Sequence, residues 1–208
     1  MPIAIITGPP GAGKTTVASH LAAASRLGVH LAGDQVFHWV VGGYVPPWMP
    51  GTSRQNGTVI SAIAAAAVQF ADGGYDVFVD GIIGPWFLPH WLQIVGRGRP
   101  PHYFVLRPSR QIAGMRATGR LAPGDLADPH PVAAMFEVFE DLGCFEAHVL
   151  DSSSQDISAT VAAIQEGLRD GRHLLDPSYE AIDMARLALK FGIDPPDGYR
   201  GPAPTRHS

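Results

Sequence analysis

The hydrophobic pattern of the chain divides into short apolar runs and longer segments with the composition of helices. Five runs have the length and the branched side chains typical of buried strands, at residues 2–7, 29–32, 75–79, 102–106 and 147–150. The segments between them predict helices at residues 15–24, 52–71, 109–119, 131–142 and 155–169. Because strands and helices alternate, we expect an α/β fold in which helices cover both faces of a parallel sheet.

Two connections between these elements are unusual. Residues 34–56 form a long loop rich in aromatic side chains, proline and glycine, at whose end Thr52 or Ser53 is the expected N-cap of the next helix. The segment GPWFLPHWL, residues 84–92, follows the third strand and is rich in proline and tryptophan, and no element is assigned to it. Both follow strands whose carboxyl ends should lie at the edge of the sheet where ligands bind.

The segment GPPGAGKTT, residues 8–16, has the spacing of a phosphate-binding loop, or P-loop. It lies between the first predicted strand and the first predicted helix, as the mechanism requires. Glycines let backbone N–H groups turn toward phosphate oxygens, and the helix N-terminus adds its own donors. We expect Lys14 to hold the β- and γ-phosphates and the Thr15 hydroxyl to bind Mg²⁺. The residues expected to contact the nucleotide are Gly8, Gly11, Ala12, Gly13, Lys14, Thr15 and Thr16.

Composition narrows the choice of partners. The 208 residues carry a net charge of −4, and the pI is near 6.1, which argues against nucleic acid or an anionic membrane as a partner. The N-terminus carries no basic leader, and the longest apolar run, residues 59–68, is too short to span a bilayer. We therefore expect a cytoplasmic monomer or homodimer. The single cysteine, Cys144, and the spacing of the nine histidines give no zinc pattern.

The expected domain organisation has three parts. Residues 1–172 form the P-loop domain, which includes a lid at about 117–131. Residues 173–193 form a helical extension, and residues 194–208 a proline-rich disordered tail.

Transfer of a phosphate fits the motifs better than hydrolysis or switching. The N-K-x-D sequence that reads guanine is absent, since the only asparagine is Asn56. The third strand ends in Asp80-Gly81, without the glutamate that activates water in hydrolysing motors. Arg116 and Arg120 are four residues apart, so on a predicted helix they share one face, and they precede the polar loop 121–130 of the expected lid. Closure of such a lid would bring positive charge to the transferring phosphate and exclude water.

In these motifs the chain resembles the small P-loop kinases, such as shikimate, gluconate and adenylate kinases and chloramphenicol phosphotransferase. It is most similar to the bacterial ATP-binding proteins of the zeta-toxin-like kinase group. The resemblance covers residues 2–171 and rests on GPPGAGKTT, LAGDQVF, SRQN, VFVDGIIGPWFLP, YFVLRP, the arginine pair and DLGCFEAHVLD. It implies a five-stranded parallel sheet of order 2-3-1-4-5, with ATP and Mg²⁺ as cosubstrate and cofactor.

The resemblance also implies roles for individual residues. Asp34 corresponds to the acid that contacts the acceptor hydroxyl, and Asp80 to the aspartate near magnesium and acceptor. Arg116 would lie against adenine, and Arg120 would touch phosphate. Arg54 and Trp86 are the further residues expected at the acceptor.

Two departures from the family pattern sharpen these expectations. Ala32 replaces the first acid of a D-x-D pair, so Thr15, and Asp80 through water, would hold magnesium. No arginine follows Asp80 in DGIIGPW, which argues against a phosphorylated acceptor, and Trp48, Trp86 and Trp91 suggest an acceptor with some apolar surface.

We therefore expect an ATP-dependent kinase acting on the hydroxyl of a small molecule. Two alternatives stay open. One is a kinase that acts on a polynucleotide or tRNA, and the other is a nucleotide-binding regulator without chemistry.

Overall fold

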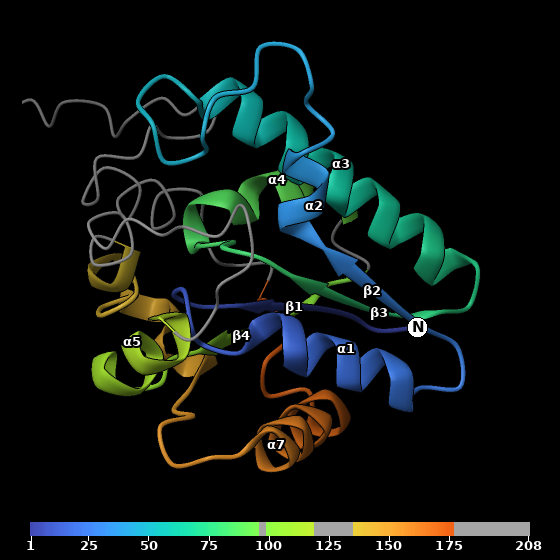
Figure 1. Cartoon of the computed structure of the whole chain (residues 1–208). Helices are drawn as coiled ribbons and strands as arrows, with labels where there is room; N and C mark the ends of the chain where they lie inside the picture. Colours follow the sequence, from blue (N-terminus) through green and yellow to red (C-terminus); the bar gives the residue numbers. More distant parts are fainter. Residues whose placement is uncertain (96–98, 119–134, 177–208) are drawn as a thin grey trace, which may run out of the picture.

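A five-stranded parallel sheet forms the centre of the computed structural model, which describes residues 1–95, 99–118 and 135–176 (Figure 1). Its strands are β1 (Ile3–Thr7), β2 (Gly28–Ala32), β3 (Asp76–Asp80), β4 (His102–Leu106) and β5 (Val149–Leu150). The order across the sheet is β2-β3-β1-β4-β5, and every neighbouring pair is parallel. This confirms the expected fold class and strand order.

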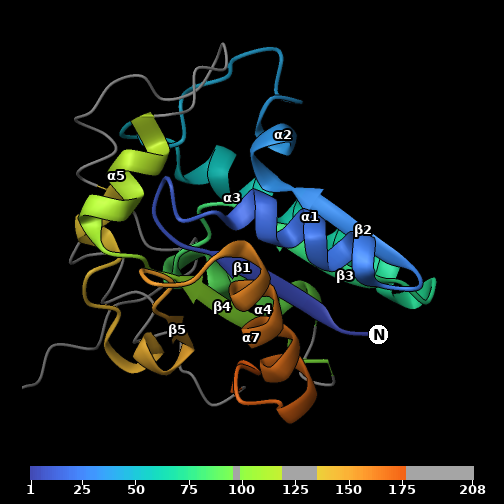
Figure 2. The same cartoon turned by 60° about the horizontal axis from the view of Figure 1, so that its bottom comes forward.

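Helices cover both faces of the sheet. The described helices are α1 (Lys14–Ala24), α2 (Gly33–Phe37), α3 (Ser53–Asp72), α4 (Leu88–Val95), α5 (Arg110–Thr118) and α7 (Ile157–Asp170), with 3-10 turns η1 (Pro85–Phe87) and η2 (Gly143–His148). Helices α3 and α4 lie on one face, and α1 and α7 lie side by side on the other (Figures 1 and 2). No helix in the described ranges is long and apolar enough to cross a membrane.

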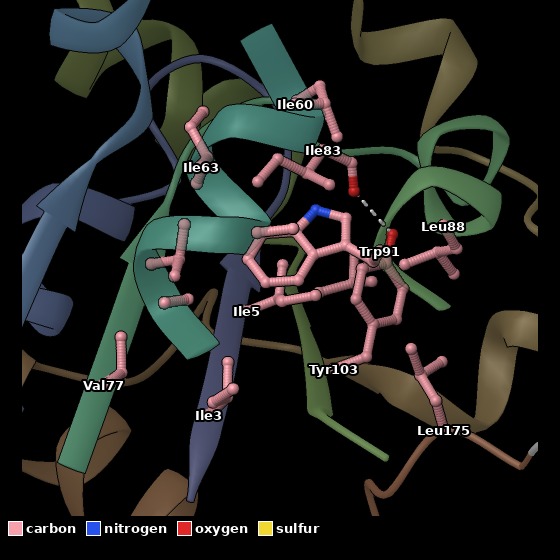
Figure 3. Close-up of a cluster of buried hydrophobic side chains, with 14 of the residues drawn as sticks. Ile3, Ile5, Ile60, Ile63, Val77, Ile83, Leu88, Trp91, Tyr103 and Leu175 are labelled. Atoms are coloured by element: carbon pink, nitrogen blue, oxygen red, sulfur yellow. Dashed lines mark hydrogen bonds between the residues drawn. The ribbon is translucent and has the colours of Figure 1, made fainter. Parts of the chain in front are cut away.

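The alternation of side chains along β1 divides the core into two layers. Ile3 and Ile5 pack on the α3–α4 side, whereas Ala4 and Ile6 pack on the α1–α7 side. Figure 3 shows the first layer, in which the indole of Trp91 lies among isoleucines from β1, α3 and the segment after β3.

Three local features differ from the sequence prediction. Residues 85–95 form η1 and α4, where no element was assigned from the sequence, and α2 interrupts the loop expected at 34–56. Thr52 does occupy the N-cap position of α3, but its side chain makes no capping hydrogen bond. Its hydroxyl instead contacts the carbonyl oxygens of Pro47 and Met49, at 3.0 and 2.8 Å, and so ties the loop to the helix. By contrast, Asp156 caps α7 by accepting from the Ala159 N–H at 2.7 Å.

The last described residues pack against the sheet. Leu174 forms an antiparallel bridge with His102, and the N–H of Tyr103 donates to the carbonyl of His173 at 2.8 Å. Leu175 is buried in the α3–α4 layer. Residues 173–175 therefore pack against the sheet, while residues 177–208 of the expected extension and tail lie outside the described residues.

Candidate nucleotide and phosphotransfer site

The P-loop connects β1 to α1 through a backbone path that only glycine follows easily. Gly8, Gly11 and Gly13 have φ angles of 140°, 79° and 88°. At Gly8 a side chain is also excluded by space, because a Cβ there would lie 2.1 Å from the carbonyl oxygen of Leu106 on β4. Gly13 is the N-cap of α1, so the helix begins at Lys14 with its N-terminus at the loop. The loop therefore has the backbone of an anion-binding site.

Lys14 lies over this loop. Its ammonium donates to the carbonyl oxygen of Pro9 at 3.0 Å, and the residue is 8% exposed. An ammonium carries three N–H donors on a flexible stem. The contact with Pro9 holds this charge above the glycine backbone, where a phosphate bound to the loop would meet it.

The carboxylate of Asp80 is held between two side chains. The Thr15 hydroxyl donates to Oδ2 at 2.5 Å, and Nε2 of His30 lies 2.6 Å from Oδ1. Asp80 is 3% exposed, so these contacts replace water around a buried acid. Because an ionised carboxylate only accepts, Nε2 of His30 is the donor. The geometry brings together the predicted metal residues Thr15 and Asp80.

The segment after Asp80 is held through the backbone N–H and the backbone carbonyl of Ile83. Its N–H donates to the Thr7 hydroxyl at 2.9 Å, and its carbonyl accepts from the Tyr103 hydroxyl at 2.8 Å (Figure 3). Burial raises the pKa of Tyr103 well above its usual value of 10.0, so this phenol keeps its proton and remains a donor. Side chains from β1, which is next to β3, and from β4, which lies beyond β1, therefore hold the turn that follows the site aspartate.

The donor set at Thr15 and Asp80 suits magnesium. Mg²⁺ prefers hard oxygen ligands, usually one or two carboxylates or hydroxyls together with phosphates and water. A hydroxyl and a carboxylate already in contact at the start of the P-loop helix provide such oxygens. The expected metal therefore fits the residues present.

Asp34 lies in α2, directly after β2. The helix begins against the end of β3, since a Cβ on Gly33 would be 2.7 Å from the carbonyl oxygen of Asp80. Asp34 itself is exposed, one residue beyond this contact. Gly33, the residue before Asp34, thus packs against the backbone of Asp80, so the carboxyl ends of β2 and β3 lie together, and contact of Asp34 with an acceptor stays a prediction. Arg54 is exposed in the first turn of α3.

The predicted tryptophans occupy different environments. Trp86 is 4% exposed and packs against Phe87 and Phe139, and Trp91 is fully buried. Their surface is used for core packing, so the expectation that Trp86 contacts the acceptor has no support from its position. Trp48 is 44% exposed and can still meet a ligand.

The arginines expected to close the site are only partly described. Arg116 is exposed on α5, with Nη2 3.5 Å from the carbonyl of Gln155. Arg120 and residues 119–131 of the expected lid lie outside the described residues. A further cation, Arg107, follows β4. It donates two hydrogen bonds to the carboxylate of Glu146, at 2.8 and 2.7 Å, and these lower the pKa of that carboxyl.

Sequence reasoning missed His30. It lies two residues before Ala32, the last residue of β2, so the two side chains are on the same face of the sheet. A polar residue at such a position, beside a strand that ends in aspartate, is the signal that could have identified it.

Comparison with known proteins supports the fold. No family model matches the sequence, and no curated protein sequence matches it. Among solved structures, the chain is similar to a sugar kinase from Janibacter, with a TM-score of 0.62 and 18% identity over 81% of this chain and 95% of that one. It is also similar to the tunicamycin resistance protein of Deinococcus radiodurans, with a TM-score of 0.58 and 18% identity over 85% of this chain and 99% of that one. At these identities the likeness shows a shared kinase-like α/β fold.

Proposed function

We propose that the protein is an ATP-dependent phosphotransferase of the zeta-toxin-like kinase group that acts on a hydroxyl of a small molecule. The observation that supports the proposal most is the contact between Thr15 and the buried Asp80 at the P-loop, with Gly33, the residue before Asp34, packed against the backbone of Asp80. A regulator that only bound nucleotide would have no need of a second acid at this strand edge.

The residues on the nucleotide side would bind and orient the triphosphate. Backbone N–H groups of Gly8 and of residues 11–13 would donate to its oxygens, together with the N-terminus of α1, whereas Pro9 and Pro10 have no N–H to offer. Lys14 would neutralise charge on the β- and γ-phosphates. Thr15, and Asp80 through water, would hold Mg²⁺, which when bound supplies charge neutralisation at the phosphates. Because the transition state of phosphoryl transfer is loose, positioning and charge provide most of the catalysis.

Asp34 would serve the acceptor. A bond forms between the acceptor oxygen and the γ-phosphorus while the bond to the β–γ bridging oxygen breaks, so ADP leaves and the hydroxyl proton passes to Asp34. Arg54, at the start of α3, would contact the acceptor from the other end of the 34–56 segment. Arg116 would lie against adenine, and Arg120 would meet the transferring phosphate.

A screen for phosphorylated product tests the proposal. The enzyme is incubated with Mg-ATP and sugars, aminoglycosides, chloramphenicol-like drugs, nucleosides, shikimate-like acids and tunicamycin. ADP formation and the mass of each compound are then measured. The sugar kinase and the tunicamycin resistance protein among the structural neighbours make sugars and tunicamycin the first compounds to try.

A matched pair of variants assigns the chemistry. Asp34→Asn should retain ATP binding and lose transfer by about 10²- to 10⁴-fold, the usual cost of removing a positioned base. Asp72→Asn changes an exposed acid that pairs with Arg99 at the far end of α3, and should leave transfer unchanged. Transfer that survives Asp34→Asn would remove Asp34 from the mechanism. Phosphorylation of RNA but of none of the small molecules would favour the polynucleotide kinase.

A further inference from the structure

We propose that His30 is a positioning residue of the magnesium site: it holds the Asp80 carboxylate from the side opposite Thr15 and keeps Oδ2 directed at the P-loop. The inference rests on the proposed function only in that magnesium and nucleotide bind at Thr15 and Asp80. It adds a residue that none of the expected motifs contains, on a strand that is not paired with β1, the strand that leads into the P-loop.

The pairing of β2 with β3 brings His30 to this place. His30 lies opposite Phe78 and Ala32 lies opposite Asp80, so His30 is the diagonal neighbour of the aspartate. Since side chains alternate along a strand, residues 30, 78 and 80 share one face of the sheet. Phe78 packs in the α1–α7 layer, which identifies that face, and α1 brings Thr15 to it.

The two contacts hold the carboxylate by both oxygens. Thr15 occupies Oδ2 at 2.5 Å and His30 occupies Oδ1 at 2.6 Å, so rotation of the carboxylate breaks at least one short hydrogen bond. The His30 side chain is 21% exposed and that of Asp80 is 4% exposed, so a partly exposed donor is paired with a buried acid. A buried acid with one donor would be costly and free to turn, and the second donor removes both problems.

The division of labour follows from the chemistry of the donors. A hydroxyl has lone pairs, so Thr15 can bind a metal through its oxygen while its O–H still faces Asp80. An imidazole nitrogen that donates its N–H to a carboxylate has no lone pair with which to bind a metal. Thr15 is therefore suited to contact the metal, and His30 to fix the acid behind it. Partners of this kind typically contribute 10- to 100-fold to metal affinity.

A purely structural role makes a different prediction. If His30 only satisfied a buried acid, its loss would lower the melting temperature and leave metal affinity of the folded protein unchanged. If it positions Asp80, metal affinity should fall in variants that lose the donor and remain folded. The affinity should return when another side chain places a donor at the position of Nε2.

The test measures metal affinity rather than turnover. Mn²⁺ is titrated into the full-length protein with ATP, and bound metal is followed by electron paramagnetic resonance. Binding of ATP without metal is measured separately by calorimetry. His30→Leu removes the donor, whereas His30→Gln and His30→Asn carry the same amide on side chains of different length. The glutamine amide can reach the position of Nε2, and the asparagine amide falls short of it.

We expect His30→Leu and His30→Asn to weaken Mn²⁺ binding about 10- to 100-fold, with His30→Gln within about threefold of wild type. ATP binding without metal should be the same in all three. His20→Leu is the control, since His20 is exposed on α1, where its ring contacts the carbonyl of Thr16, and neither metal nor ATP affinity should change.

The outcomes separate this inference from the proposed function. If His30→Asn binds Mn²⁺ as wild type does, the positioning role is refuted, even if His30→Leu does not fold. Equal loss in the asparagine and glutamine variants would also refute it, because reach would then not matter. If the wild-type protein shows no metal-dependent nucleotide binding at all, the proposed function itself fails.

Discussion

The glycine that begins the P-loop offers a quantitative test of the loop geometry. Gly8 has a φ of 140°, and an added Cβ would lie 2.1 Å from the backbone oxygen of Leu106. Backbone strain of this kind costs about 1–3 kcal/mol. Forcing an extra carbon into a packed site costs about 1–3 kcal/mol more. Gly8→Ala should therefore lose about 2–6 kcal/mol, a large part of the ~5–15 kcal/mol that stabilises an ordinary domain.

Gly13→Ala is the matched comparison for Gly8→Ala. Gly13 has a φ of 88°, but nothing lies within 4 Å of its added Cβ. Only the left-handed backbone is then strained, which costs about 1–2 kcal/mol. In a chain of this size 1 kcal/mol lowers the melting temperature by about 2–4 °C. The difference between the variants thus reports the contact with Leu106.

Thermal and urea denaturation of both variants measure this difference directly. We expect the melting temperature of Gly13→Ala to fall by roughly 2–8 °C and that of Gly8→Ala to fall clearly further. The larger loss in Gly8→Ala depends on β4 lying directly against Gly8, the first residue of the loop. Equal stability of the two variants, or a Gly8→Ala protein as stable as wild type, would refute that packing.

Two further predictions concern the core. Burial lowers the pKa of His148 from 6.5 to about 4, so between these pH values the unfolded chain binds more protons than the folded one. The free energy of unfolding should therefore fall as the pH decreases from about 6.5 to 4, by up to ~1.4 kcal/mol per pH unit. Urea titrations at several pH values should show a shallower slope for His148→Leu, and an unchanged slope would contradict this assignment. Trp91→Ala should cost about 3–5 kcal/mol, since its indole is fully buried, whereas Trp39→Ala, at a side chain 73% exposed, should stay within about 0.5 kcal/mol; similar urea midpoints for the two variants would count against the packing in Figure 3.

The sequence was informative where local patterns determine structure. The apolar runs locate all five strands to within a few residues, and the glycine spacing identifies the P-loop, because both depend on neighbours along the chain. Parallel strands also place their carboxyl ends together, which is why Asp80 and the start of α2 could be expected side by side. These elements position the nucleotide half of the candidate site.

Features that depend on contacts between distant residues could not be predicted in the same way. The diagonal contact of His30 with Asp80 requires the pairing register of β2 and β3, which no single segment contains. Trp86 was expected at the acceptor because an aromatic side chain after a strand end can either bind a ligand or pack, and only the tertiary structure shows that it packs. Thr52 was expected to cap α3, but loop carbonyls compete for its hydroxyl.

Calorimetric titration of ATP, with and without Mg²⁺, into the wild-type protein and Lys14→Ala tests the central claim most directly. A hydrogen bond to a charged group contributes about 1.5–3 kcal/mol, which corresponds to roughly 10- to 100-fold in affinity. We predict that the wild-type protein binds ATP more tightly with Mg²⁺, and that Lys14→Ala loses affinity by this factor while its circular dichroism spectrum stays unchanged. Equal affinity of the folded variant and the wild type would contradict the assignment of residues 8–15 as the phosphate site.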